Sequence, residues 1–253
     1  MSLKTPLEEA LGAYMGRYYT ELVADTPAME EYIARGLRKS IVWVPGRMID
    51  SVQDMLNEYR KNANEDGPGL SSKLPVVFVC LSKDFQPALP DFGVAAAAPL
   101  SFRSPADEHG RIYKVRASIN EYRAQLAFIA PEGGSAGSLA LQFHLYANAN
   151  RRFHHGHHFA GQTHNFPAVL ENIDIGAVSV PTDQKNLTIL VADMTVRATI
   201  PMFQAPKPGE PNDGKPAPSG YPVVVNISAD DLVAKSGSDT FIDQDGNKKA
   251  VFR

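Results

Sequence analysis

A proline-rich segment near residue 210 limits which part of the chain can build a hydrophobic core. Residues 205–222 contain six prolines and three glycines in 18 positions. Proline lacks a backbone N–H and fixes φ, so this composition favours a stiff, extended linker over a helix or a sheet. Residues 223–253, which follow it, are too few to bury much apolar surface alone and read as a β arm. We therefore expect the core in residues 71–204, after an N-terminal helical region in residues 1–70.

The N-terminal region carries helix-start signals and apolar residues at helical spacing. Thr5 and Glu8 fit a capping box that starts a first helix, and Thr26-Pro27 signals the start of a second. The spacing of apolar residues predicts a third helix over Arg47–Arg60. The apolar face of the second helix is expected to contain Met29, Ile33 and Leu37.

Strand patterns begin at residue 74. Leu74–Leu81 is a short apolar run rich in valine, typical of a strand covered on both faces, and Cys80 within it reads as a buried, inert thiol. Residues 84–110 contain four prolines and are expected to form a long surface loop. Ile112–Ile129 then predicts extended structure, because apolar and polar residues alternate in it.

The rest of the core alternates between helix and strand patterns. Ser135 is expected to cap a helix that runs to about Asn150, and residues 151–165 read as a polar, histidine-rich loop. Ile173–Val180 and Asn186–Phe203 predict a hairpin, with a change in apolar phase near Ala192-Asp193. The expected fold class is α+β: N-terminal helices, then a mixed or antiparallel sheet packed by a helix, with a C-terminal β arm.

Composition excludes several classes of protein. The chain has 253 residues, a formal net charge of −3 and a single cysteine. This balance argues against a strongly basic nucleic-acid binder, and one cysteine cannot form an internal disulfide or a cysteine-rich zinc module. No apolar run reaches the length of a bilayer span, so we expect a soluble protein with no membrane partner.

Four histidines gather in residues 154–158, and imidazole is a good ligand for zinc, nickel and copper. His154 and His158 are four residues apart, as in the helical metalloprotease pattern, but His155 stands where that pattern needs a glutamate. We therefore expect a polar loop here, with no resident metal and no cofactor.

Residues 133–137 match G-x-S-x-G, the nucleophile elbow of serine hydrolases. Pro131-Glu132 separates the match from the preceding extended stretch, whereas an elbow follows its strand directly. The histidines after Ser135 also precede the first aspartate after it, Asp174, so the usual order of serine, acid and histidine fails. A tight turn into a helix is the expected structure, and we expect no catalytic residues and no enzyme activity.

Three segments and the order of elements carry a resemblance to a known family. The segments are IVWVPGRMIDSVQDMLNEYR (Ile41–Arg60), KLPVVFVCLSKDF (Lys73–Phe85) and EYRAQLAFIAPEGGSAGSLALQFHLYA (Glu121–Ala147). Together with the strand, helix and hairpin order up to Phe203, the chain resembles the tail terminator, or gateway, proteins in the neck of contractile-tailed bacteriophages.

The resemblance implies a structural virion protein that joins head and tail. Such proteins form a ring, here expected to be a homohexamer, that caps the tail tube, touches the sheath and meets the collar or neck proteins. DNA would pass through the lumen without sequence-specific binding. The protein would belong to the phage neck and would assemble in the host cytoplasm.

Contacts with partner subunits are expected in the histidine-rich loop and in the C-terminal arm, which could add a strand to a neighbour. The residues chosen for these contacts are Arg151, Arg152, His154, His155, His157, His158, Tyr221, Val223, Val225 and Ile227. Alternative functions are another tail or baseplate component that binds sheath or tube, a metal-dependent enzyme built on the histidines, a serine hydrolase and an adaptor for a host protein.

Overall fold

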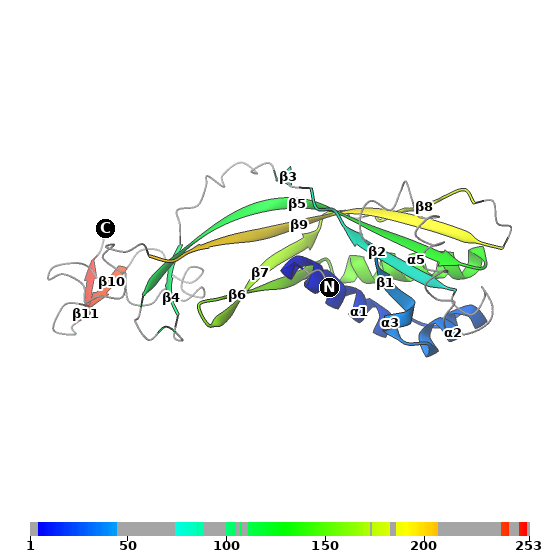
Figure 1. Cartoon of the computed structure of the whole chain (residues 1–253), viewed down its shortest axis with the longest axis horizontal. Helices are drawn as coiled ribbons and strands as arrows, with labels where there is room; N and C mark the ends of the chain where they lie inside the picture. Colours follow the sequence, from blue (N-terminus) through cyan, green and yellow to red (C-terminus); the bar gives the residue numbers. More distant parts are fainter. Residues whose placement is uncertain are drawn as a thin grey trace. The chain divides into compact units, whose positions relative to one another are not determined.

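A computed structural model describes residues 5–44, 74–84, 86–88, 100–104, 107, 111–172, 174–182, 186–206, 239–242 and 248–251. Figure 1 labels the elements in chain order. The helices are α1 (Pro6–Thr20), α2 (Pro27–Ala34), α3 (Leu37–Ser40) and α5 (Gly133–Ala149). The strands are β1 (Ile41–Trp43), β2 (Val76–Leu81), β3 (Gln86–Pro87), β4 (Leu100–Arg103), β5 (Ile112–Ala130), β6 (Arg152–Phe159), β7 (Gln162–Leu170), β8 (Ala177–Ser179), β9 (Thr188–Gln204), β10 (Asp239–Ile242) and β11 (Lys248–Val251).

The fold is α+β, as expected from the sequence. Nine described strands form one mixed sheet with the order β1-β2-β5-β9-β7-β6, in which β3 and β4 also pair with β5, and β8 pairs with β9. β1 is parallel to β2, whereas the pairing of β2 with β5 is antiparallel. The chain divides into two compact units: residues 1–89, 119–156 and 165–199 form the first, and residues 90–118, 157–164 and 200–253 form the second.

The first unit is built around β2, which is buried along its whole length. Val76, Phe78 and Cys80 belong to a hydrophobic cluster with residues of β5 and β9, and the side chains between them point to the opposite face. The prediction of a strand covered on both faces is therefore confirmed, and so is the buried Cys80 thiol.

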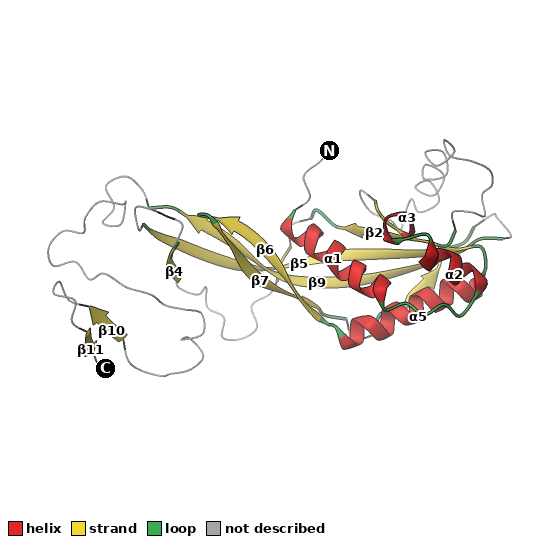
Figure 2. Ribbon diagram, turned by 90° about the horizontal axis from the view of Figure 1, so that it is seen from below, coloured by secondary structure: helices red, strands yellow, loops and turns green. Residues whose placement is uncertain are grey.

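Helices α1 and α5 lie side by side on one face of this sheet (Figure 2). The Tyr18 hydroxyl of α1 donates to the Leu139 carbonyl of α5 at 2.8 Å, and the Tyr146 hydroxyl donates back to the Tyr14 carbonyl. α1 starts as predicted, because the Thr5 side chain accepts from the Glu8 backbone N–H and the Glu8 carboxylate accepts from the Thr5 N–H.

The second helix was predicted at the correct start but with one wrong face residue. Met29 is buried, but Leu37 lies beyond the end of α2 and is exposed. The helix ends because Gly36 has a φ of +90°, a conformation that reverses the chain before α3. Strand β1 follows α3 directly and was not predicted, since a three-residue strand is too short to show a period. The predicted helix over Arg47–Arg60 lies outside the described residues.

The helix predicted from Ser135 is present but begins earlier. α5 starts at Gly133, and Glu132 is its N-cap residue with extended backbone angles. Ser135 lies inside the first turn instead of capping it. The predicted hairpin after α5 is also present, since β8 pairs antiparallel with β9, and two consecutive buried residues, Val191 and Ala192, mark the change in apolar phase.

Two segments predicted as loops contain strands. Within residues 84–110, β3 and β4 pair antiparallel with β5. Residues 151–165 are a β-hairpin, in which β6 and β7 are neighbours joined by Ala160-Gly161. Both turn residues have positive φ, 50° and 80°, as a two-residue hairpin turn of the primed type requires. The prediction missed this turn because alanine is a rare residue at positive φ.

At the C-terminal end, β10 and β11 pair antiparallel, and the predicted turn signal Asp245-Gly246 lies outside the described residues. Residues 207–238, which include most of the predicted linker and the start of the arm, lie outside the described residues. No helix in the described ranges is long and apolar enough to cross a membrane.

Candidate functional site

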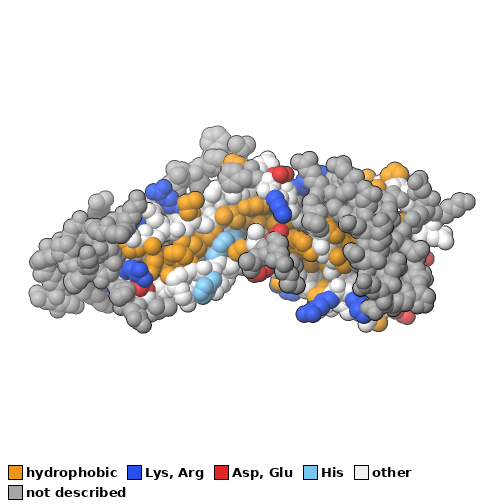
Figure 3. Space-filling model, viewed as in Figure 1, with side chains coloured by type: hydrophobic (Ala, Val, Ile, Leu, Met, Phe, Trp, Pro, Cys, Tyr) orange, Lys and Arg blue, Asp and Glu red, His pale blue; other side chains and the backbone are white. Residues whose placement is uncertain are grey.

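The histidine segment forms strand β6, so its side chains alternate between two faces. His155 is 1% exposed and His157 is half-buried, whereas His154 and His158 are exposed. The four imidazoles therefore cannot converge on one ion from this strand. Among the described residues, no group of three or more histidine, cysteine, aspartate or glutamate side chains is placed to hold a metal. Histidines do reach the surface in the view of Figure 3.

The two inward histidines have structural surroundings. The His155 ring lies 6.3 Å from the ring of Phe166 on β7, between centroids. Burial lowers the pKa of His157, which favours the neutral imidazole at neutral pH. His155 does not reach the surface in this structure, so of the four histidines predicted as partner contacts only His154 and His158 are well exposed.

The second unit has an aromatic cluster around the tip of the same hairpin. The rings of Phe159 and Phe203 stack at 4.5 Å, and His164 packs edge-on against Phe102 at 4.7 Å. Tyr113 joins the cluster through Phe102 and Phe159. These rings give the second unit a core of its own, and His164 belongs to it as a packing residue.

An ion pair holds the start of β5 beside this cluster. The Arg111 guanidinium and backbone N–H both donate to the Asp107 carboxylate, and the Tyr113 hydroxyl donates to the same carboxylate at 3.2 Å. The hydrogen bonds to Asp107 raise the pKa of Arg111, which keeps the pair charged. The arrangement stabilises a turn and offers no free reactive group.

Of the two arginines predicted as partner contacts, one bonds within the chain and the other is exposed. Arg151 donates its guanidinium to the backbone carbonyls of Leu170 and Glu171, so it anchors the start of the hairpin. Arg152 is the first residue of β6, and its side chain is exposed. The other predicted contacts, Tyr221, Val223, Val225 and Ile227, lie outside the described residues.

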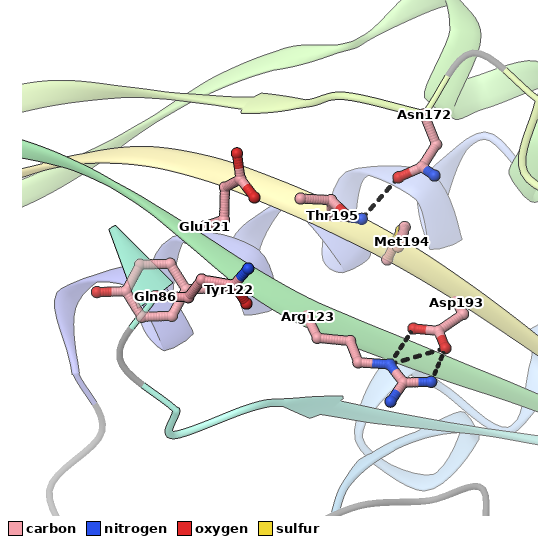
Figure 4. A pocket seen from close by; sticks show the side chains of 8 residues that line it. All are labelled: Gln86, Glu121, Tyr122, Arg123, Asn172, Asp193, Met194 and Thr195. Carbon is pink, nitrogen blue, oxygen red and sulfur yellow. Dashed lines mark hydrogen bonds and ion pairs between the residues drawn. The ribbon is translucent and has the colours of Figure 1, made fainter. Parts of the chain in front are cut away.

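A polar pocket of about 370 Å³ opens on the first unit, over β5 and β9 (Figure 4). Arg123 and Asp193 form a bidentate ion pair across the two strands, and the Thr195 N–H donates to the Asn172 side-chain oxygen at 2.6 Å. Arg197 bridges Glu121 and Glu171 beside it. The charges compensate one another, so the charged groups in and beside the pocket are engaged in ion pairs between neighbouring segments.

Ser135, the serine of the G-x-S-x-G match, is fully buried in the first turn of α5. Its hydroxyl donates to the Glu132 carboxylate at 2.9 Å and lies 2.8 Å from the Thr26 hydroxyl. These bonds tie the start of α5 to the start of α2. The surroundings are those of a structural serine, because neither neighbour is a histidine that could act as a base.

The surface features that the sequence did not reveal are exposed apolar side chains. They are Val23, Leu37, Ile119, Leu141, Leu145, Val178 and Met202. Val178 is 72% exposed on β8, and among the described strands β8 pairs with β9 alone. Of these residues, Leu37 was predicted on the apolar face of the second helix, since a period identifies an apolar position without showing what covers it.

No protein-family model and no curated protein sequence matches this chain.

Proposed function

We propose that the chain is a structural virion protein, a tail terminator or gateway subunit whose ring joins the tail tube and sheath to the neck of a contractile-tailed phage. The observation that carries the proposal is the outer edge of β8, which no other described strand pairs with. A free strand edge with an outward apolar side chain is a template for strand addition, and a ring of identical subunits needs such a surface on each copy. The resemblance described above supplies the place of that ring in the virion.

The edge of β8 has a defined hydrogen-bonding register. The Val180 N–H donates to the Ile189 carbonyl of β9 at 2.9 Å, and Val178 lies opposite Val191 in the same ladder. Because donors alternate along a strand, the Ser179 N–H points away from β9. A neighbour's arm could pair with that N–H, as the predicted C-terminal arm would require.

The test measures the mass of the tag-free protein by light scattering, with negative-stain images of the same fractions. We expect closed rings of six subunits, and binding of the protein to the head-proximal end of tails from the phage that encodes it. A protein that stays monomeric and binds no tail contradicts the proposal. Binding at the distal end would favour the alternative, a baseplate or tube-initiating component.

The contact itself is tested with Ser179→Pro, which removes the outward N–H but leaves the ladder to β9 intact. We expect rings to be lost, whereas the matched variant Ser179→Ala keeps them. Rings that survive Ser179→Pro would exclude this edge as the contact and leave the ring function standing.

A further inference from the structure

The outward face of α5 carries exposed leucines and no formally charged side chain, and its polar residues are His144 and Asn148. Leu141 and Leu145 are one helical turn apart on the side opposite the buried Leu139 and Phe143, and they are 58% and 59% exposed. The Val23 N–H donates to the Gln142 side-chain oxygen at 2.8 Å, and the Gln142 amide donates back to the Val23 carbonyl at 2.9 Å. These bonds place Val23, itself 68% exposed, beside the same turn of α5.

The whole helix lacks formal charge. None of the 17 residues from Gly133 to Ala149 is aspartate, glutamate, lysine or arginine. A helix at a protein surface normally carries charged residues on its solvent side. α1, which packs beside α5, has Glu8, Glu9 and Arg17 in its first and last turns. The absence of charge beside the exposed leucines therefore suits a helix whose leucine-bearing side is covered by a partner.

A glycine on this face points the same way. Gly137 lies one turn before Leu141, and a Cβ built on it would meet no atom within 4 Å. Packing within the chain does not require glycine there, although glycine weakens a helix relative to alanine. Glycine at this position would allow the backbone of a second helix to approach α5 closely from outside.

We propose that this face is a twofold contact between two copies of the chain, in which the α5 helices pack antiparallel. Charge selects a second copy as the occupant. Glu132 and Asp25 are exposed near the N-terminal end of α5, where Asp25 accepts a hydrogen bond from Ser138 at 2.6 Å. Arg152 is exposed just after the C-terminal end.

Antiparallel packing brings the acidic end of one helix to the basic end of the other, twice over. The uncharged middle has nothing to repel its own copy, and the helix dipoles oppose each other favourably. Leu141 is the midpoint of Gly133–Ala149, so the twofold axis would pass beside it and bring the two Leu141 side chains together. The contact is independent of the ring, which needs two different surfaces on each subunit.

The experiment uses cysteine cross-linking of the full chain. The native Cys80 is buried, so Leu141→Cys adds one accessible thiol, and Leu37→Cys places a thiol at another exposed apolar position of the same unit, away from β8. Under mild oxidation we expect covalent dimers from Leu141→Cys at least tenfold faster than from Leu37→Cys. Equal rates for the two variants would overturn the proposal.

Sedimentation measures the contact without a disulfide. We expect the wild-type protein, whether single subunit or ring, to associate in pairs at micromolar concentrations, and Leu141→Lys to weaken this pairing at least tenfold while circular dichroism stays unchanged. A wild-type chain whose sedimentation shows no association beyond that of Leu141→Lys would overturn the contact. If the protein forms rings but Leu141→Cys cross-links no faster than the control variant, this contact is rejected and the proposed function stands. If Leu141→Cys cross-links fast but no rings form, this contact stands and the proposed function is rejected.

Discussion

Helices α1 and α5 pack side by side on the same sheet face, yet they meet their surroundings differently. α1 has a capping box at its start and charged residues at both ends. α5 has no side-chain hydrogen bond at its N-cap and no formal charge. α1 is thus suited to a permanent water-facing side, whereas α5 also carries exposed leucines on the side that faces away from the sheet. The difference shows that burial inside one chain does not account for all the apolar side chains of a helix.

The two faces of α5 give the largest expected contrast. Phe143 is fully buried, with its ring 5.3 Å from Tyr18 and 5.9 Å from Phe128. We expect Phe143→Ala to lower the free energy of unfolding by about 3–5 kcal/mol, because it leaves a cavity. Leu141→Ala, on the outer face, should change it by less than about 0.5 kcal/mol in the monomer. Urea unfolding in dilute protein measures both, and equal losses would contradict the structure.

The next contrast concerns the hydroxyls between the two helices. Tyr18→Phe removes the bond to the Leu139 carbonyl and should cost about 1–1.5 kcal/mol. The Tyr14 hydroxyl is buried and has no hydrogen-bond partner in the described structure, so Tyr14→Phe should cost nothing or stabilise slightly. Chemical denaturation compares the free energies of unfolding of the two variants. A larger loss for Tyr14→Phe would contradict the assignment of the stabilising hydrogen bond to the Tyr18 hydroxyl.

Alkaline pH should act on the same pair of tyrosines. Burial raises the pKa of Tyr18 and of Tyr14 well above the usual value near 10. The unfolded chain then loses these protons first, so stability is fully present below about pH 10 and falls above it, by up to about 1.4 kcal/mol per pH unit for each group. Unfolding curves from pH 8 to 11 test this, with Tyr18→Phe expected to flatten the decline.

The cap of α1 provides a smaller contrast. Thr5→Ala removes the side chain that accepts the Glu8 N–H and should cost about 1 kcal/mol. Thr5→Ser keeps a hydroxyl in place and should lower the free energy of unfolding by only about 0.3 kcal/mol. Thermal melts of the two variants separate the loss of the cap from a general effect of the position, which would show as equal shifts.

The smallest effects, and the sharpest for the comparison, come from one glycine in each helix. A Cβ at Gly12 or at Gly137 would meet no atom within 4 Å, so alanine at either position should stabilise the monomer by about 0.5–1 kcal/mol. Only Gly137→Ala should also weaken self-association in sedimentation. If both variants leave association unchanged, the outer face of α5 does not approach another helix closely.

Sequence reasoning succeeded where local chemistry decides the structure. The capping box at Thr5, the proline start of α2 and the continuous apolar run of β2 each produced the predicted element. It failed where the decisive feature was a backbone angle or a partner. Residues 151–165 form a hairpin instead of the predicted loop because Ala160 adopts a positive φ in the turn. The three residues of β1 gain their strand conformation from pairing with β2.

The candidate surfaces could be predicted only in part. A helical period explains the buried Leu139 and Phe143 of α5, but Leu141 and Leu145 are just as apolar and look like core until their exposure is known. The four histidines drew attention as a cluster, and only strand alternation separates the exposed His154 and His158 from the others. Which positions face outward depends on tertiary packing, which the sequence pattern does not encode.

The two-residue turn at Ala160-Gly161 has a consequence for how this surface could evolve. Insertion of one residue within β6, between the turn and the histidines, would slip that strand by one position against β7. Because side chains alternate, His155 and His157 would then face solvent and His154 and His158 would face inward. A single codon could thus exchange which imidazoles meet the solvent without replacing any histidine, whereas a pair of residues inserted together would restore the original pattern.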